Sequence, residues 1–240
     1  MLSRPGVQVS AAPIRPAQWK ELPINGAQDS TGPGRLLSVN VGRPQPVTAG
    51  RHIVETAIWK SAVAGPVRVR GVNVEGDDQA DRSVHGGPDK AVYAYAIEEI
   101  RTWETELGRR LDGAVFGENL TTEGVDVSGA VVGQRWRIGT TLLEVAQPRL
   151  PCFKLGIRLG TPGFVRQFAQ ASRPGAYLRI IEEGQLEAGD EIVVTHQPDH
   201  AVTMRLVFDA ILRDQTLIPQ ALQAPELPAS LRGWLSGRIK

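Results

Sequence analysis

Apolar and polar residues alternate in several short runs along this chain, a pattern typical of strands with one buried face. Residues 67–70 have this period of two, and so do residues 135–138 and 141–145, which flank Gly139-Thr140. Because two alternating runs around a Gly-containing pair favour a tight turn, the latter two runs predict a β-hairpin. Further strands are predicted at 35–41, 91–95, 176–181 and 191–195.

Helical spacing of apolar residues is less frequent. It predicts an amphipathic helix over 96–110, where apolar residues recur every three or four positions among Glu and Arg. A shorter helix is predicted over 162–172, with Pro162 in its first turn. From His200 onward the pattern is helical again, and three prolines divide this tail into short pieces.

Taken together, these elements predict a mainly β protein. Strands and helices do not alternate as parallel βαβ units require, and no internal repeat is present. Sparse aromatic residues (5%) beside 26 Gly and 17 Pro suit short strands joined by tight turns. We therefore expect a β-barrel or sandwich with peripheral α-helices and a short helical C-terminal tail.

The chain of 240 residues is long enough for one sizeable core with appendages. Residues 1–33 are rich in Pro, Gly, Ala and Ser without sustained periodicity, so we expect a poorly ordered N-terminal extension. The main domain is predicted at 34–197 and the helical tail at 198–240.

Charge and apolar content limit the classes of partner. The net charge of +1 gives no overall attraction to nucleic acid or to an acidic membrane, so a site for an anionic ligand must be local. No apolar run approaches the roughly 20 residues that span a bilayer, and no secretory leader is apparent. The first twenty residues contain basic but no acidic residues, as organelle transit peptides do, yet their prolines disfavour the amphipathic helix of such peptides. We expect a cytoplasmic protein.

Cys152 is the only cysteine, so an intramolecular disulfide is excluded and a reducing compartment is favoured. It follows Pro151 and stands between Arg149 and Lys154, whose positive charges stabilise a thiolate. The strand predicted at 141–145 leads into this run, so we expect the sulfur at a strand end beyond the sheet edge. The alternative is a buried, inert cysteine.

The polar segment 76–90 predicts a long functional loop. In it, the glycines of His85-Gly86-Gly87 let backbone amides approach an anion or a carbonyl oxygen. Arg82 and Lys90 are suited to neutralise a phosphate, and His85 to act as an acid or base. The alternative is that His85 caps a turn and the acidic residues only solvate the loop.

A further polar cluster, Phe116-Gly117-Glu118-Asn119-Leu120, lies between apolar residues. Its simplest interpretation is a turn in which Asn119 bonds to its own backbone.

Three segments, 76–95, 116–124 and 147–155, together resemble the signature of the MOSC domain (the molybdenum-cofactor sulfurase C-terminal domain), in its YiiM-like branch. The likeness covers about residues 35–196. It implies a MOSC-type β-barrel that binds the molybdenum cofactor (molybdopterin), with Cys152 as the metal ligand. The resemblance also implies that His85 and Arg82 deliver a proton to the departing oxygen and hold that oxygen. The implied cofactor-binding residues are Lys60, Gly86, Gly87, Lys90, Asn119 and Arg149.

The resemblance also implies an activity, the reduction of N-hydroxylated compounds, such as hydroxylated purine bases, to amines. No cysteine cluster for an iron–sulfur centre follows the domain, so the electrons must come from a separate redox protein. Two alternatives stay open. One is a non-catalytic cofactor carrier or sulfur-transfer module that uses Cys152, and the other is a metal-free Cys152–His85 thiol enzyme.

Overall fold

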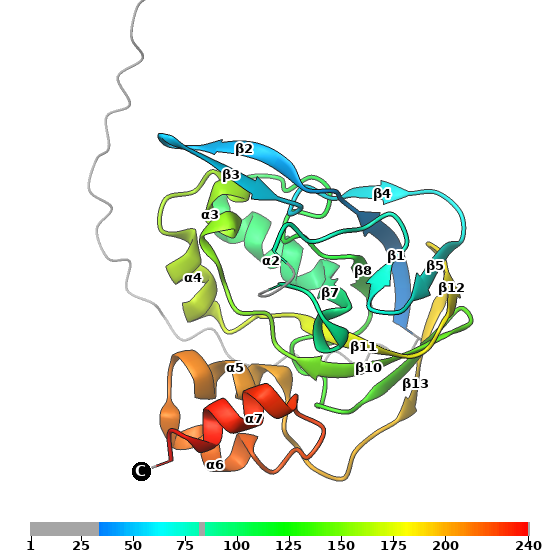
Figure 1. Ribbon diagram of the computed structural model, residues 1–240, viewed down its shortest axis with the longest axis vertical. Coiled ribbons are helices and arrows are strands. Elements are labelled where there is room, and N and C mark those ends of the chain that lie inside the picture. The colour runs from blue at the N-terminus through cyan, green and yellow to red at the C-terminus, as the bar shows by residue number, and fades with distance from the viewer. Residues whose placement is uncertain (1–33, 82–84, 240) are drawn as a thin grey trace, which may run out of the picture. The chain divides into compact units, whose positions relative to one another are not determined.

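The computed structural model describes residues 34–81 and 85–239, so the predicted extension 1–33 lies outside the described residues. Seven strands close into a barrel in the order β1, β13, β9, β10, β11, β7, β8 and back to β1 (Figure 1). Closure is made where Gly34 pairs with Ile192. The barrel strands are β1 (Gly34–Val41), β7 (Val92–Ala96), β8 (Leu120–Glu123), β9 (Arg135–Ile138), β10 (Thr141–Gln147), β11 (Ala176–Glu182) and β13 (Glu191–His196).

The predicted hairpin is confirmed as β9–β10, and each of the other strands predicted from alternation is present with its bounds shifted by no more than one residue. The sequence missed several short strands outside the barrel. β4 (Ser61–Val63) extends the sheet beside β1, and β2 (Gln45–Ala49) and β3 (His52–Thr56) form a separate hairpin. β12 (Gly184–Leu186) and β6 (Asn73–Val74) form a small third sheet with β5 (Val67–Arg70), which the sequence did predict.

One connection corrects the expectation that no βαβ unit is present. β7 and β8 pair in parallel, and the helix α2 (Ile97–Leu107) lies between them in the chain. The strand β8 contains Thr121 and Thr122, which are buried although they are polar. Because burial of these hydroxyls is decided by tertiary contacts, no alternation of apolar and polar residues marks this strand in the sequence.

The barrel interior is filled by apolar side chains, among them Trp136, Ile138 and Leu143, each fully buried. The C-terminal helices belong to the same cluster through Val207 and Leu235. These elements are α5 (Met204–Leu212), η2 (Gln215–Leu217), α6 (Ile218–Ala221) and α7 (Ala229–Ser236). The boundary predicted at 197/198 lies between the last strand, β13, and the first C-terminal helix, α5. Residues on both sides of it belong to one hydrophobic core.

A second, aromatic cluster lies outside the barrel wall and carries two helices that matter for the site. α3 (Phe153–Leu159) was not predicted, and α4 (Phe164–Ala171) begins two residues after Pro162. Trp103 of α2 stacks against Phe168 with ring centroids 6.2 Å apart, and Tyr95 of β7 stacks on Phe116 at 4.4 Å. The first contact packs α4 against α2, and α3 joins the same cluster through Leu155 and Leu159.

Within the described residues, none of the helices combines the length and apolar character that crossing a bilayer requires.

Candidate functional site

A cleft brings together four segments that are far apart in the chain. Counted with its open mouth, it encloses about 580 Å³, within the range of about 300–1,000 Å³ that is typical of small-molecule sites. Its walls come from residues within 56–60, from 77–80, His85 and Lys90, and from residues within 116–119 and 149–154, with Tyr93 of β7 and Tyr177 of β11.

Most of the residues singled out in the sequence meet in this cleft. Those that line it are Lys60, His85, Lys90, Asn119, Arg149 and Cys152. Gly86 and Gly87 adjoin the cleft in the chain but do not line it. Gly87 has a φ of 97°, a conformation that favours glycine, and it precedes the 3-10 turn η1 (Pro88–Lys90). Arg82 lies outside the described residues.

Cys152 is half-buried and lines the cleft, unlike a cysteine enclosed in a core. The expectation that its sulfur lies at a strand end is wrong, because β10 already ends at Gln147 and Cys152 is the N-cap residue of α3. The reason is local. Pro148 and Pro151 lack the backbone N–H that would continue the strand ladder, so the chain leaves the sheet before it reaches the thiol.

Arg149 is the most unusual charged group of the cleft. Its side chain is buried, and its guanidinium lies 5.4 Å from the ring centre of Tyr93 and 5.7 Å from that of Phe168. Nη1 has no hydrogen-bond partner in the part of the chain that the structure describes. A buried N–H of a cation without an acceptor costs free energy, so this atom is suited to an anionic ligand in the cleft.

Lys60 is held by a buried carboxylate that the sequence did not single out. Its ammonium pairs with Asp77 Oδ1, which also accepts a hydrogen bond of 2.8 Å from the backbone N–H of Gly42. Burial lowers the pKa of Lys60 from its ordinary value, and the charge of Asp77 opposes this shift. Nothing in the local sequence distinguishes Asp77 from the solvated acids of its loop.

Asn119 connects three segments and does not bond to its own backbone, so its interpretation as a simple turn is wrong. Its Nδ2 donates to Asn40 O at 3.1 Å and to Asp77 Oδ2 at 2.9 Å. Its Oδ1 accepts from the backbone N–H of Tyr93 at 3.1 Å. Both amide hydrogens are therefore used inside the protein, and Asn119 positions the wall of the cleft. A direct contact with a ligand stays a prediction.

His85 is flanked by positive charge. Its pKa is lowered from 6.5 to about 4, first by burial and then by Lys154, Arg149 and Lys90. The imidazole is therefore neutral near pH 7, and an anion bound among these cations would raise its pKa again. The backbone N–H of His85 does donate to Asp81 O at 2.9 Å, as a turn residue would, while its side chain faces the cleft.

The loop that carries Lys90 is fastened to the barrel. Arg179 of β11 pairs through Nε with Asp89 and donates from Nη1 to Glu144 Oε1 at 2.8 Å. Gln147 Nε2 donates to Asp89 O at 3.1 Å. Because β10 and β11 are central barrel strands, these bonds fix Lys90 relative to the barrel wall.

The fold and the cleft define a β-barrel protein whose small-molecule site combines one thiol with several buried or half-buried cations. A model of the family described as "MOSC domain" matches residues 81–193. A relative described as "Uncharacterized protein YflK" from Bacillus subtilis (strain 168) is 36% identical over 170 residues, which is 71% of this chain and 77% of that protein. The chain belongs to the MOSC domain family, and to its YiiM-like branch.

Two further similarities support this assignment. The crystal structure of YiiM from Geobacillus stearothermophilus superimposes with a TM-score of 0.71 at 29% identity, covering 87% of this chain and all of that one. A protein described as "Reductase" from Gibberella moniliformis (strain M3125 / FGSC 7600) is 34% identical over 170 residues, which is 69% of this chain. The matched region is only 30% of that longer protein.

Proposed function

We propose that this MOSC protein is a molybdenum-cofactor oxidoreductase that reduces N-hydroxylated compounds to amines. The observation that carries the proposal is the presence, in one cleft, of an accessible thiol and a buried guanidinium whose Nη1 lacks an acceptor. Membership of the MOSC family and similarity to a protein named "Reductase" support an oxidoreductase. In the overall reaction the N–O bond breaks, two electrons and two protons are consumed, and the products are the amine and water.

The donor set of the cleft fits the cofactor. A thiolate is a soft ligand and suits molybdenum, which points to Cys152 as the metal ligand. Lys60, Lys90 and Arg149 offer cationic donors for a phosphate, and the unpaired Nη1 of Arg149 would gain an acceptor. When bound, the cofactor would supply the two-electron chemistry at its metal.

The residues of the chain itself would bind, orient and protonate. A neutral His85 offers a hydrogen bond to the substrate oxygen, and it becomes a proton donor once bound anionic charge raises its pKa. Arg82 would hold the departing oxygen, and the amides of Gly86 and Gly87 would contact the pterin. The free thiol of Cys152 supports a reducing compartment such as the cytoplasm.

Expression with molybdate or with tungstate tests the proposal. We expect molybdenum and pterin to copurify with the wild type, and a hydroxylaminopurine to be reduced by a chemical reductant only with the molybdenum form. Cys152→Ser should lose metal and activity while its far-UV circular dichroism stays unchanged. Full activity after the tungstate exchange would contradict a molybdenum-dependent reaction. Equal molybdenum content in the wild type and Cys152→Ser would contradict Cys152 as the metal ligand.

The same preparation separates the alternatives. Tight cofactor binding without turnover under any reductant would favour a carrier or sulfur-transfer module. Activity without cofactor, with a burst of a covalent intermediate on Cys152, would favour a thiol enzyme.

A further inference from the structure

Positive charge is concentrated in one stretch of this nearly neutral chain. Residues 145–181 contain six Lys or Arg and no Asp or Glu, whereas the whole chain has 27 basic and 26 acidic residues. The remainder of the chain is therefore acidic, and the charge difference between the two parts is large. This stretch includes α3, whose Lys154 lines the cleft, α4, and parts of β10 and β11.

Half of these cations are used inside the protein. Arg149 faces the cleft, Arg173 forms an ion pair of 2.8 Å with Glu106, and Arg179 pairs with acids of the barrel.

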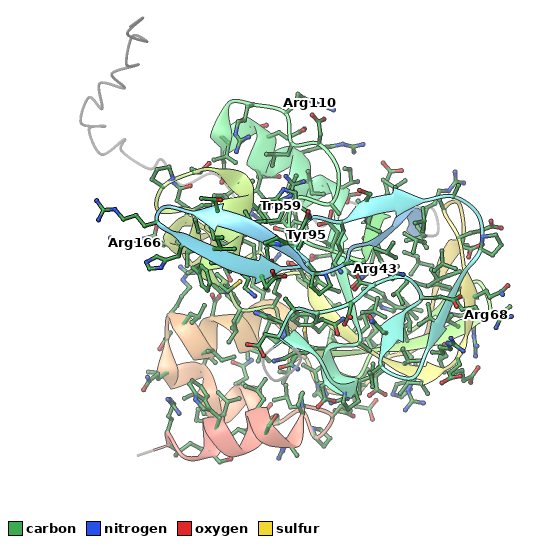
Figure 2. The ribbon with its side chains drawn as sticks, turned by 45° about the horizontal axis from the view of Figure 1, so that its top comes forward. Arg43, Trp59, Arg68, Tyr95, Arg110 and Arg166 are labelled. Carbon is green, nitrogen blue, oxygen red and sulfur yellow. The ribbon has the colours of Figure 1, made fainter. Side chains whose placement is uncertain are left out.

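The other half are left without a carboxylate. Lys154 and Arg158 on α3 and Arg166 on α4 have no acidic side chain within 4 Å among the described residues. Arg158 instead lies over the ring of Trp59, 5.6 Å from its centre. Arg166 is exposed and extends away from the molecule (Figure 2). Arg158 also donates from Nη2 to Asp112 O at 3.4 Å, so Lys154 and Arg166 are the cations most available to charges on another molecule.

Exposed apolar side chains lie next to these cations in the chain. Leu150 and Phe153, on either side of Cys152 in the chain, are 42% and 60% exposed. The hairpin β2–β3 runs past α3 in both views and presents Ile53, which is 75% exposed (Figures 1 and 2). Exposed apolar groups surrounded by cations, with arginine prominent, are the composition of a protein-binding surface.

We propose that the rim surface, made of Leu150, Phe153, Lys154, Arg158 and Arg166, docks an acidic electron-carrier protein. This inference rests on the proposed function, which consumes two electrons for each N–O bond broken. The reduced carrier is oxidised at this surface and the electrons enter the cleft next to Cys152. Charge complementarity steers the encounter, and a small interface lets the spent carrier leave.

Position favours a carrier protein over other anionic partners. Lys154 belongs both to the rim surface and to the wall of the cleft, so an occupant of the rim sits at the cleft mouth. Among anionic partners, an electron carrier is the one that needs this proximity. A net charge of +1 gives no general attraction to a membrane or to nucleic acid.

The test compares two exposed arginines on opposite sides of the molecule, Arg166 and Arg68 (Figure 2). Binding of the full-length protein to oxidised flavodoxin, plant-type ferredoxin and, as a basic control, cytochrome c is measured by titration at low and moderate salt. We expect the acidic carriers to bind more tightly than cytochrome c. Arg166→Glu should weaken this binding about threefold to tenfold, and the matched control Arg68→Glu by less than about twofold.

The turnover of each variant then separates docking from catalysis. With a small reductant such as dithionite, both variants should reduce the N-hydroxylated substrate at the wild-type rate. With reduced carrier, Arg166→Glu alone should be slow and should lose most of its salt dependence.

The docking surface would be overturned if both variants lost carrier binding equally, or if acidic carriers bound no more tightly than cytochrome c. It would also be overturned if the protein bound phosphatidylserine vesicles or a second copy of the chain, and Arg166→Glu abolished that binding while carrier binding persisted. If carriers bind as expected but no reductant supports turnover, the proposed function fails and the docking surface stands.

Discussion

The side-chain amide of Asn119 donates a hydrogen bond of 2.9 Å to Asp77 Oδ2, across 42 positions of the chain. The other oxygen of the same carboxylate holds the ammonium group of Lys60. Asp77 therefore connects its own loop to Asn119, which precedes β8, and to Lys60, which precedes β4. The geometry of one wall of the cleft depends on this single carboxylate.

Asp77→Asn should leave the buried ammonium of Lys60 without its counter-charge. We expect the free energy of unfolding to fall by about 3–5 kcal/mol, since the side chains of Lys60 and Asp77 are only 8% and 1% exposed. The double variant Lys60→Met/Asp77→Asn should recover part of that loss, because it removes the unpaired charge. Denaturant titration measures both, with exposed Asp112→Asn as a control expected within about 0.5 kcal/mol of wild type. Equal stabilities of the single and double variants would refute the coupling.

Glu118 should make stability depend on pH. Burial raises its pKa from 4.5 to about 7, so the unfolded chain ionises between these values while the folded chain does not. The stabilising contribution of Glu118 is therefore full below about pH 4.5 and is lost as pH rises to about 7, by on the order of 3 kcal/mol.

Glu118→Gln should remove the part of the pH dependence that comes from Glu118, because an amide does not ionise. The fold should persist, since the amide keeps an acceptor for the backbone N–H of Phe116, which lies 3.0 Å from Glu118 Oε2. Glu99, whose pKa is also raised to about 7, stays in the variant, so about half of the slope should remain. Denaturant titrations between pH 4 and 8 measure it. An unchanged slope would show that Glu118 is ionised in the folded protein.

His85 should titrate near pH 4 in the free protein. Its lowered pKa means that the unfolded chain takes up a proton as pH falls from 6.5 to about 4 while the folded chain does not, so this residue reduces stability in that window. Histidine NMR resonances, assigned with His85→Gln, measure the pKa directly. Adding phosphate should move it upward, towards its ordinary value. A value at or above 6.5 without any anion would contradict this account.

Arg149→Met should separate binding from stability. Methionine fills most of the volume and removes a buried cation whose Nη1 lacks an acceptor, so the free energy of unfolding should stay within about 1 kcal/mol of wild type despite the lost contacts with Tyr93 and Phe168. Phosphate binding, measured by calorimetry, should weaken at least about tenfold. Arg149→Ala serves as the control, since the cavity that it leaves should destabilise the fold. Unweakened phosphate binding by Arg149→Met would exclude Arg149 from the anion site.

Strands with clear alternation, such as β5 and β9, could be predicted from the sequence, because one face of each is buried and the other is exposed or half-buried. The hairpin β9–β10 is the best example, since its turn residues and both of its patterns agree. β8 and α3 could not be predicted in this way. β8 buries Thr121, whose hydroxyl meets Asn40 and Glu118 only after folding, and Thr122, whose hydroxyl has no partner among the described residues. α3 begins directly after a proline-containing run with no helical signal before it.

Some residues of the candidate site could likewise be predicted from the sequence and others could not. Cys152, Arg149, His85 and Lys90 could be named from residue type and neighbours, because a thiol among cations and a histidine before two glycines are unusual locally. Asp77, Tyr93 and Tyr177 could not, because aspartate in a polar loop and tyrosine in a strand are ordinary. Burial and long-range hydrogen bonds give them their roles.

The sequence by itself determined which segments form the barrel strands, β8 excepted, and which residues carry reactive groups, since both follow from side-chain chemistry and short-range periodicity. The tertiary structure alone decided that segments between residues 56 and 177 share one cleft and that Asn119 ties its wall together. It also decided that Arg149 lines this cleft while its buried Nη1 has no acceptor among the described residues. These properties depend on burial and on contacts between distant segments. They exist only once the barrel has closed.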